Sequence, residues 1–315
     1  MVNKSKGYAL FKKHRKWLDR FLRNCEKLNR SGHTIKNYRS DLERYIHFYE
    51  YFYGSHLNRA NAKTIESYKE FLSGSSLRPQ KGWRKLLWYR RVKNAPSPLN
   101  LGVNSQKRHL SSIKNFYDYL IQSHEDNSKA FGKNPVKSKI HTIKVKDSDI
   151  EHTKLLNHRD WDSLDKNLYK VKDRLVAYLL YFGGLRLEEL CRLRYSDFSQ
   201  RTKSLSFIRK GGERHYLKIR EFETIFDLLE SHKSMASVES EYLFTNKTGS
   251  QVSSRAMYAF IKRMLMRAGL PSDLTPHSFR KACATNMYVE SKDILMVRNY
   301  LNHKDAKVTQ TYIEY

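Results

Sequence analysis

Cysteine is scarce in this chain of 315 residues, and no two cysteines lie close together. The three present are Cys25, Cys191 and Cys283, and the sequence contains no C-x-x-C pair. This spacing argues against a disulfide framework and against a zinc site built on paired cysteines. We therefore expect a reducing, intracellular location.

Long apolar runs are missing as well. The longest, LVAYLLYFGGL at residues 175–185, is too short to cross a bilayer. The N-terminal stretch MVNKSKGYALFKKHRKWLDRFL is basic and lacks the continuous apolar segment of a signal peptide. These two features predict a cytoplasmic protein with no membrane partner.

Acidic residues are few relative to basic ones. Lys and Arg number 60 against 32 Asp and Glu, a formal net charge of +28. Such an excess indicates a polyanionic partner, because each neutralised phosphate releases counterions. An anionic membrane surface, bound through a surface helix, is the alternative. Residues 1–135 hold 28 basic and 10 acidic residues, and residues 136–315 hold 32 and 22, so the first part carries the denser positive charge.

The spacing of apolar residues predicts a mainly α fold with a small β-hairpin. About four amphipathic helices are expected in the first part: the opening segment, 31–52 capped by Ser31, 65–72 capped by Thr64, and 105–123. We interpret their aromatic stripes as core packing. The second part is expected to begin with helices at 158–168 and 171–185, to form a hairpin at 203–219 around a glycine pair, and to be helical from there to its end.

A polar stretch that starts at Asn134-Pro135 divides the two parts. We predict a helical DNA-binding domain at 1–135, a linker at 136–151 and a second domain at 152–315. The apolar fraction of 39% is sufficient for a core in each.

The segment 75–100 carries seven Lys and Arg, two Trp and no acidic residue. Basic residues interleaved with aromatics suit a nucleic-acid backbone and its bases, although an ordinary solvated loop with a buried Trp is an equal alternative. The candidate DNA-binding residues there and on the following helix are Arg78, Lys81, Trp83, Arg84, Lys85, Arg90, Arg91, Lys107 and Arg108.

Four short stretches of the second part need a joint explanation. They are GGLRLEELCRL with Arg186, the hairpin tip with Lys210, LTPHSFRKACAT with His277 and Arg280, and the terminal segment with His303 and Tyr312. Taken singly, each has an ordinary structural explanation, such as an ion pair of Arg186 with a glutamate one turn on. Thr275 and Pro276 suit the N-cap and first position of a helix, which places the pair in the third stretch on one face of its first turn.

The order Arg, Lys, His-x-x-Arg, His and Tyr resembles the signature of the tyrosine recombinase (lambda integrase-type, Xer-like) family. The matching stretches are GLRLEEL, RKGGERHYLKI, TPHSFR and LNHKDAKVTQTYIEY, and the N-terminal helices look like the family's SAM-like core-binding domain. The resemblance implies a two-domain DNA clamp with an α+β catalytic domain. It also implies that Lys210 is the general acid for the leaving 5′-hydroxyl, that His277 handles protons near the tyrosine, that His303 hydrogen-bonds the phosphate, and that Glu189 supports the site from behind.

The chemistry explains why these residue types are needed. A tyrosine with a pKa near ~10 is a weak nucleophile, and it attacks a phosphodiester only if the charge of the transition state is neutralised. Arg186 and Arg280 can fork onto the non-bridging oxygens, which makes a metal or other cofactor unnecessary. The family's spacing selects Tyr312 rather than Tyr315, and the product is a covalent 3′-phosphotyrosine that needs no ATP for rejoining.

The resemblance implies a site-specific recombinase that acts on double-stranded DNA at specific sites, as a homotetramer on two sites, with possible accessory proteins and a location at the nucleoid. A type IB topoisomerase-like relaxase and an inactive DNA-binding architectural protein are the alternatives. Many relatives carry a further helix after the nucleophile, whereas only Ile313, Glu314 and Tyr315 follow here, so the coupling of protomers is open. Lys281, where relatives often have histidine, is interpreted as a tolerable change on a basic surface.

The segment 75–100 yields a first prediction. Deleting it should weaken DNA binding and flatten the dependence of affinity on salt, because phosphate contacts set the slope of that dependence. Filter binding or fluorescence anisotropy at several salt concentrations measures both quantities. Unchanged affinity and slope would count in favour of the ordinary loop.

Overall fold

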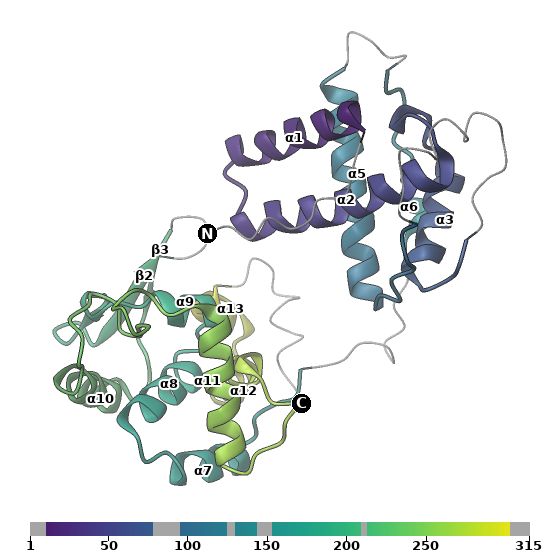
Figure 1. The fold of residues 1–315 in the computed structure, drawn as a ribbon. Coiled ribbons are helices and arrows are strands. Elements are labelled where there is room, and N and C mark those ends of the chain that lie inside the picture. Colours follow the sequence, from purple (N-terminus) through teal and green to yellow (C-terminus); the bar gives the residue numbers. More distant parts are fainter. Residues whose placement is uncertain (1–10, 78–94, 125–129, 144–152, 209–212, 303–315) are drawn as a thin grey trace. The chain divides into compact units, whose positions relative to one another are not determined.

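A computed structural model describes residues 11–77, 95–124, 130–143, 153–208 and 213–302. The chain divides into two compact units, residues 1–150 and 151–315 (Figure 1). Each unit has its own apolar core. No helix among the described residues is both long enough and apolar enough to cross a membrane.

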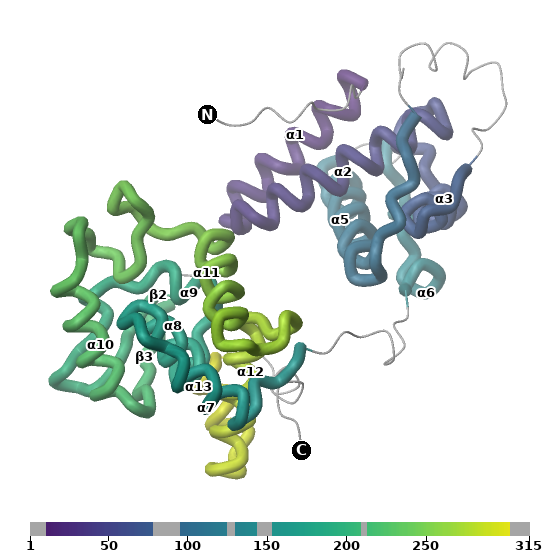
Figure 2. The backbone as a smooth tube through the Cα atoms, turned by 60° about the horizontal axis from the view of Figure 1, so that its bottom comes forward, coloured from purple at the N-terminus to yellow at the C-terminus, as the bar shows by residue number. Residues whose placement is uncertain are grey.

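The secondary-structure elements in the described part of unit 1 are all helices. Its elements are α1 (Lys12–Lys27), α2 (Gly32–Tyr53), a 3₁₀ turn η1 (Leu57–Arg59), α3 (Ala62–Leu72), α5 (Val103–Gln122) and α6 (Ser138–His141). In Figures 1 and 2, α1 lies beside α2 and α5 crosses both. The four long helices are those that apolar spacing predicts, so that prediction is confirmed.

Aromatic side chains form the core of unit 1, as the sequence predicts. Phe21 of α1 contacts Tyr38 of α2 and Phe116 of α5, with ring centroids 5.3 and 5.5 Å apart. The buried hydroxyls are satisfied, because Tyr117 donates to the carbonyl of Leu57 at 2.9 Å and the Tyr45 hydroxyl lies 3.1 Å from that of Tyr117. Edge-to-face and tilted contacts of this kind add to the free energy gained by burying the rings.

The helix starts of unit 1 follow capping rules, with one correction. Ser31 accepts the backbone N–H of Thr34 at 3.2 Å, which confirms it as the N-cap of α2. Thr64 is not the N-cap of α3, because the side chain of Asn61 accepts the Thr64 N–H at 3.2 Å and starts the helix one turn earlier. Thr64 is instead the N3 residue of a capping box, and its hydroxyl oxygen accepts the backbone N–H of Asn61.

The segment expected to be a linker includes residues that pack on unit 1. Val136 and His141 are buried, and Nε2 of His141 lies 3.2 Å from the carbonyl oxygen of Ala62. The residues described as far as 143 therefore contact the helical core that precedes them.

Unit 2 surrounds one apolar helix, α8 (Val171–Tyr181), in which the last seven residues are all buried. The other helices are α7 (His158–Lys166), α9 (Leu187–Arg192), α10 (Phe222–Ser234), α11 (Ser254–Arg267), α12 (Pro276–Ser291) and α13 (Ile294–Leu301). Helices α9, α10 and α12 pack directly on α8 (Figure 1). Burial on all sides explains why α8 reads as an unbroken apolar run.

The predicted hairpin is confirmed and belongs to a three-stranded antiparallel sheet. Strand β2 (Ser204–Ile208) pairs with β1 (Phe198–Ser199) and with β3 (Arg214–Leu217), and the last described pair before the tip is Ile208 with Arg214. Leu205, Phe207 and Leu217 face the core, which is the alternation expected of a half-buried sheet.

The prediction that unit 2 is helical from the hairpin onward is wrong for residues 235–253. Residues of this stretch form two isolated β-bridges. Tyr242 pairs with Arg194, which lies earlier in the chain, and Thr245 pairs with Gln251. The side-chain oxygen of Asn246 accepts the N–H groups of Thr248 and Ser250, and such a local turn competes with a helix.

A glycine pair turns the chain between α8 and Arg186. Gly184 has a φ of +57°, and a Cβ atom on it would lie 2.6 Å from Cδ2 of Leu301 and 3.0 Å from Sγ of Cys283. Helices α12 and α13 therefore pack directly on the backbone of this turn. Only glycine provides both the left-handed conformation and the missing Cβ.

Substitution of Gly184 tests this packing. Gly184→Ala should cost about 1–2 kcal/mol for the left-handed backbone and more for the contacts with Leu301 and Cys283. Gly269→Ala is the matched control, because Gly269 has a φ of +69° with no atom within 4 Å of the added Cβ. Urea unfolding of the full chain should show a clearly larger loss for the first variant, and equal losses would contradict the packing argument.

Candidate active site

The first arginine of the motif is held by a glutamate one turn along α9. The carboxylate of Glu189 accepts the backbone N–H of Arg186 at 2.8 Å and its Nη1 at 3.0 Å. Glu189 is buried, whereas 40% of the Arg186 side chain is exposed. The ion pair fixes the orientation of a guanidinium that is still open to solvent.

The second arginine, Arg280 on α12, is buried with 2% of its surface exposed. Its Nη1 donates to the carbonyl of Gly184 and its Nη2 to the carbonyl of Leu301 at 2.7 Å. These bonds join the turn before Arg186 to the end of α13, across 96 and 21 residues of sequence. They use two of the five N–H groups of the guanidinium.

The C-terminus of α13 is closed by side chains from other elements. The last four carbonyls of a helix have no partner within it, so each needs one from elsewhere. Asn302 ends the helix in the left-handed conformation, with a φ of 48°. All four carbonyls accept a hydrogen bond. The backbone N–H of Asn302 donates to the carbonyls of Arg298 and Asn299. The side chain of His215 donates to the carbonyl of Tyr300, and that of Arg280 donates to the carbonyl of Leu301.

His277 lies on the first turn of α12, three residues before Arg280. Thr275 is the N-cap and Pro276 the first residue, as the sequence predicts, and the Thr275 N–H bonds Oγ of Ser278 at 3.0 Å. Desolvation, followed by the positive charges of Arg280 and Arg186, lowers the pKa of His277. His277 and Arg280 share the first turns of α12, and Arg280 bonds the carbonyl of Gly184, two residues before Arg186.

Three other predicted site residues, Lys210, His303 and Tyr312, lie outside the described residues. In sequence, Lys210 falls between the described ends of β2 and β3, and His303 and Tyr312 follow the end of α13. Their roles stay predictions.

The interpretation of Lys281 as a surface residue is wrong. Only 3% of it is exposed, and its Nζ donates to the carbonyl of Thr153 at 3.1 Å. The reason is its place on α12, which is buried around its circumference from Ser278 to Thr285. This lysine joins α12 to the first described residue of unit 2.

The sequence analysis missed His215, which contacts the end of α13. A histidine on a hairpin strand carries no signal of its own, because its partner is a backbone carbonyl 85 residues away. The regular alternation along β3, with Leu217 buried on the same face, is the pattern that places this side chain toward the core.

In unit 1, Arg108 is held in place and Lys107 is exposed. Nη1 of Arg108 lies 2.9 and 3.0 Å from the two carboxylate oxygens of Asp41, which is buried and also accepts Oγ of Ser112 at 2.8 Å. Burial raises the pKa of Asp41, while Ser112 and Arg108 oppose that shift. The other seven candidate DNA-binding residues, from Arg78 to Arg91, lie outside the described residues.

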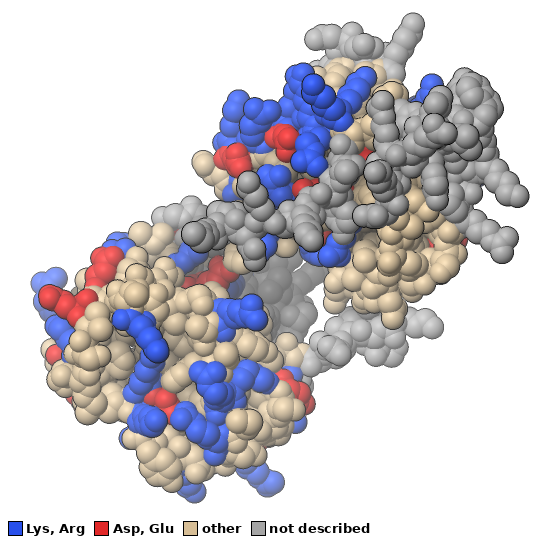
Figure 3. Space-filling view, in the orientation of Figure 1, with Lys and Arg blue, Asp and Glu red and all other residues tan. Residues whose placement is uncertain are grey.

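Basic side chains gather over α1 on the face of unit 1 seen in Figure 3. A depression of about 500 Å³ on this unit is lined by Arg20, Arg23, Asn24, Lys27 and Tyr119. This helix contributes to the dense positive charge of the first part of the sequence: Lys12, Lys13, Arg15, Lys16, Arg20, Arg23 and Lys27.

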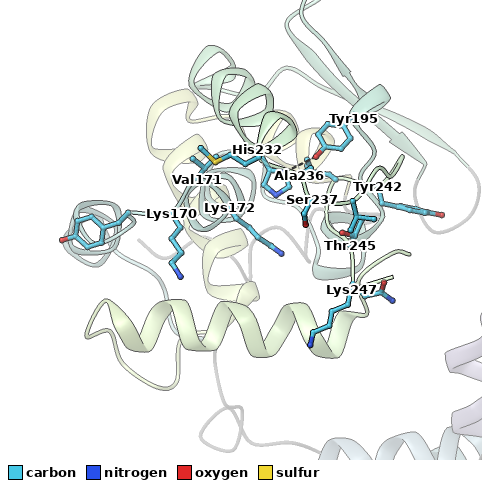
Figure 4. A pocket seen from close by; sticks show the side chains of 15 residues that line it. Lys170, Val171, Lys172, Tyr195, His232, Ala236, Ser237, Tyr242, Thr245 and Lys247 are labelled. Carbon is cyan, nitrogen blue, oxygen red and sulfur yellow. Dashed lines mark hydrogen bonds between the residues drawn. The ribbon is translucent and has the colours of Figure 1, made fainter. Parts of the chain in front are cut away.

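One pocket of unit 2 is separate from the candidate site. It measures about 740 Å³ and shares no lining residue with the motif. Figure 4 shows Lys170 and Lys172 from the start of α8 on one side and Lys247 on another, with the Tyr195 hydroxyl 3.0 Å from Nδ1 of His232. No group of acids, histidines and cysteines among the described residues is arranged to hold a metal ion.

Unit 2 thus carries Arg186 just after the glycine turn, His277 and Arg280 at the start of α12, and a small antiparallel sheet that contacts α13 through His215. A family model described as the phage integrase family matches residues 139–315. The chain belongs to this family, which confirms the resemblance seen in its motifs.

The curated relatives agree. Tyrosine recombinase XerD of Shewanella oneidensis is 28% identical over 225 residues, 66% of this chain and 69% of that protein. Tyrosine recombinase XerC of Staphylococcus saprophyticus is 23% identical over 285 residues, 90% of this chain and 86% of that protein. The similarity to XerC therefore extends into unit 1.

Solved structures share the fold. XerH site-specific recombinase bound to palindromic difH substrate, in a post-cleavage complex, superposes with a TM-score of 0.72 at 17% identity, over 99% of this chain and 94% of that one. A lambda integrase dimer bound to a COC′ core site gives 0.64 at 16% identity, over 95% and 77%. The predicted fold class, mainly α with a small sheet in the second domain, is confirmed.

The effect of the two guanidinium groups on the pKa of His277 can be measured without an assay of enzymatic activity. Arg186→Gln should raise the pKa of His277, because the removed positive charge disfavours the protonated ring. Proton NMR titration of the ring signals, assigned with a His277 variant, gives this pKa. Arg192→Gln on the exposed side of α9 is the control and should leave the pKa of His277 unchanged. An unchanged pKa in Arg186→Gln would show that the guanidinium of Arg186 does not lie near His277.

Proposed function

We propose that this chain is a site-specific DNA recombinase that cuts and rejoins strands through a covalent 3′-phosphotyrosine. One observation carries the proposal. The buried Arg280 bonds both the turn that precedes Arg186 and the end of the helix that precedes His303 in sequence. A side chain that belongs to the motif thus joins described segments next to two other motif positions, Arg186 and His303, and this supports the proposal.

The substrate of this reaction is a phosphodiester of duplex DNA. Arg186 and Arg280 bind the non-bridging oxygens, whose charge grows as the pentacovalent transition state forms. Because its pKa is lowered, His277 is neutral near pH 7 and can accept the phenolic proton of Tyr312. The phenolic oxygen bonds to phosphorus while the bond to the 5′-oxygen breaks, and Lys210 gives that oxygen its proton.

Rejoining reverses these steps. A 5′-hydroxyl loses its proton to Lys210 and attacks the phosphotyrosine, and the phenolic oxygen leaves with a proton from His277. No bond energy is lost, since one phosphodiester replaces another. When the attacking hydroxyl belongs to a second duplex, the outcome is strand exchange, which requires more than one subunit on paired sites.

A separate basic unit supports a recombinase over a simple relaxase. Unit 1 supplies positive charge and a positioned Arg108, and the relatives with similar sequences are tyrosine recombinases. Exchange between two marked DNA sites tests this point directly, whereas relaxation of a supercoiled plasmid without exchange would indicate a topoisomerase-like enzyme.

The nucleophile is tested by substitution. Tyr312→Phe should bind DNA as the wild type does and form no detectable covalent adduct on a nicked suicide substrate, because the attacking oxygen is gone. Denaturing gels measure the adduct, and Tyr315→Phe is the matched control that should still form it. An adduct that persists in Tyr312→Phe and is lost in Tyr315→Phe would move the nucleophile to Tyr315.

A further inference from the structure

Asp41 is a carboxylate buried between helices α2 and α5 of unit 1. It belongs to α2, only 1% of its side chain is exposed, and its two oxygens lie 2.9 and 3.0 Å from Nη1 of Arg108 on α5. Oγ of Ser112, one turn further along α5, donates to Oδ2 of Asp41 at 2.8 Å. A carboxylate removed from water is costly unless such partners compensate it, so its retention in this place needs an explanation.

The neighbouring histidine does not supply the compensating charge. His109 is fully buried, its Nε2 lies 3.2 Å from Oδ1 of Asp41, and its Nδ1 lies 3.0 Å from the hydroxyl of Tyr68. Desolvation, followed by the positive charges of Arg108 and Arg44, lowers the pKa of His109 to about 4. The ring is therefore neutral near pH 7, and Arg108 is the positive partner of the buried carboxylate.

Arg108 is held at one end of its guanidinium and is open to solvent elsewhere. Both contacts with Asp41 are made by Nη1, and 42% of the Arg108 side chain is exposed. The parallel N–H groups of Nε and Nη2 take no part in these contacts, and such an edge of a guanidinium matches two oxygens of a phosphate. A surface arginine normally moves among many rotamers, whereas the buried acid keeps this one in place before a ligand arrives.

We propose that Asp41 is a positioning residue that fixes Arg108 so that Nε and Nη2 bind one backbone phosphate of the DNA. The proposal rests on the proposed function and names a side chain through which unit 1 holds the substrate. Asp41 itself touches no DNA and acts through Arg108. The alternative is that the pair only packs α5 on α2 and that Arg108 has no part in binding.

The sign of one substitution separates these two explanations. Asp41→Asn keeps the shape of the side chain and removes a negative charge, so net charge alone predicts DNA binding at least as tight as that of the wild type. Positioning predicts the opposite. Because a loose arginine must be ordered on binding, Asp41→Asn should bind about fivefold more weakly. Fluorescence anisotropy of the full chain with labelled duplexes of several unrelated sequences, at several salt concentrations, gives the affinity and its salt slope.

Variants of Arg108 show whether its contact is with a phosphate. Arg108→Gln should weaken binding about tenfold, equally for all the duplexes, and reduce the salt slope by about one. Arg108→Lys keeps the charge and therefore the slope, but it lacks two parallel donors and should bind more weakly than the wild type. In the Arg108→Gln background, Asp41→Asn should cause no further loss, because no guanidinium is left to position.

Asp19→Asn is the matched control, because it makes the same change of charge at an acid of α1 that is 47% exposed and lies 3.9 Å from Arg39. It should bind DNA no more weakly than the wild type. Urea unfolding is recorded for each variant. Ser112→Ala is the second test should Asp41→Asn not fold, since it removes one bond to the carboxylate and keeps the charge. It should lose a smaller part of the affinity, and only when Arg108 is present.

Three outcomes would overturn the proposal. Binding by Asp41→Asn as tight as that of the wild type would show that the carboxylate does not position Arg108. An equal loss in the Arg108→Gln background would show that Asp41 supports only the fold of unit 1. A changed sequence preference of Arg108→Gln with an unchanged salt slope would show a base contact in place of the phosphate. The recombinase function is tested separately, by the adduct of the wild type on the nicked suicide substrate, so the two can fail independently.

Discussion

The structure of unit 2 depends on one buried positive charge. A guanidinium removed from water costs several kcal/mol unless its donors are bonded. Arg280 meets this cost with carbonyls of the protein, and the carbonyl of Leu301 belongs to a helix C-terminus, where the helix dipole favours a cation. The charge is stabilised only when the glycine turn and α13 both stand beside α12. Folding of the unit and formation of the site are therefore the same event.

Small side chains and exposed carbonyls make this arrangement possible. Gly184 presents its backbone to α12 and α13 because no Cβ separates them. The last turn of α13 presents carbonyls that its own helix cannot satisfy, and Arg280 and His215 supply the missing donors. Two of the four carbonyls that the end of α13 leaves unsatisfied, those of Tyr300 and Leu301, therefore fix a side chain of another element.

Local signals in the sequence predicted the elements and the motif, whereas long-range contacts were out of reach. Apolar spacing identified the helices of unit 1, and alternation identified the hairpin. The sequence does not identify the N-cap of α3, since Asn61 and Thr64 both suit that position. The hydrogen bonds between these two residues in the folded chain assign it to Asn61. The bonds of Arg280 cross up to 96 residues, and the burial of Lys281 contradicts the usual preference of lysine for the surface. Neither residue type reveals its partner before the chain is folded.

The candidate site is also a place where like charges are kept close together. Desolvation first, and then the positive charges of Arg280 and Arg186, lower the pKa of His277. Such crowding opposes folding, and the bonds of Glu189 and of the two carbonyls hold it in place. In the proposed reaction a phosphate brings negative charge to this position and the transition state brings more, which offsets the positive charge of the two guanidinium groups. In the proposed reaction the positive charge is fixed before DNA arrives, and this preorganisation stabilises the transition state for attack by a weakly nucleophilic phenol.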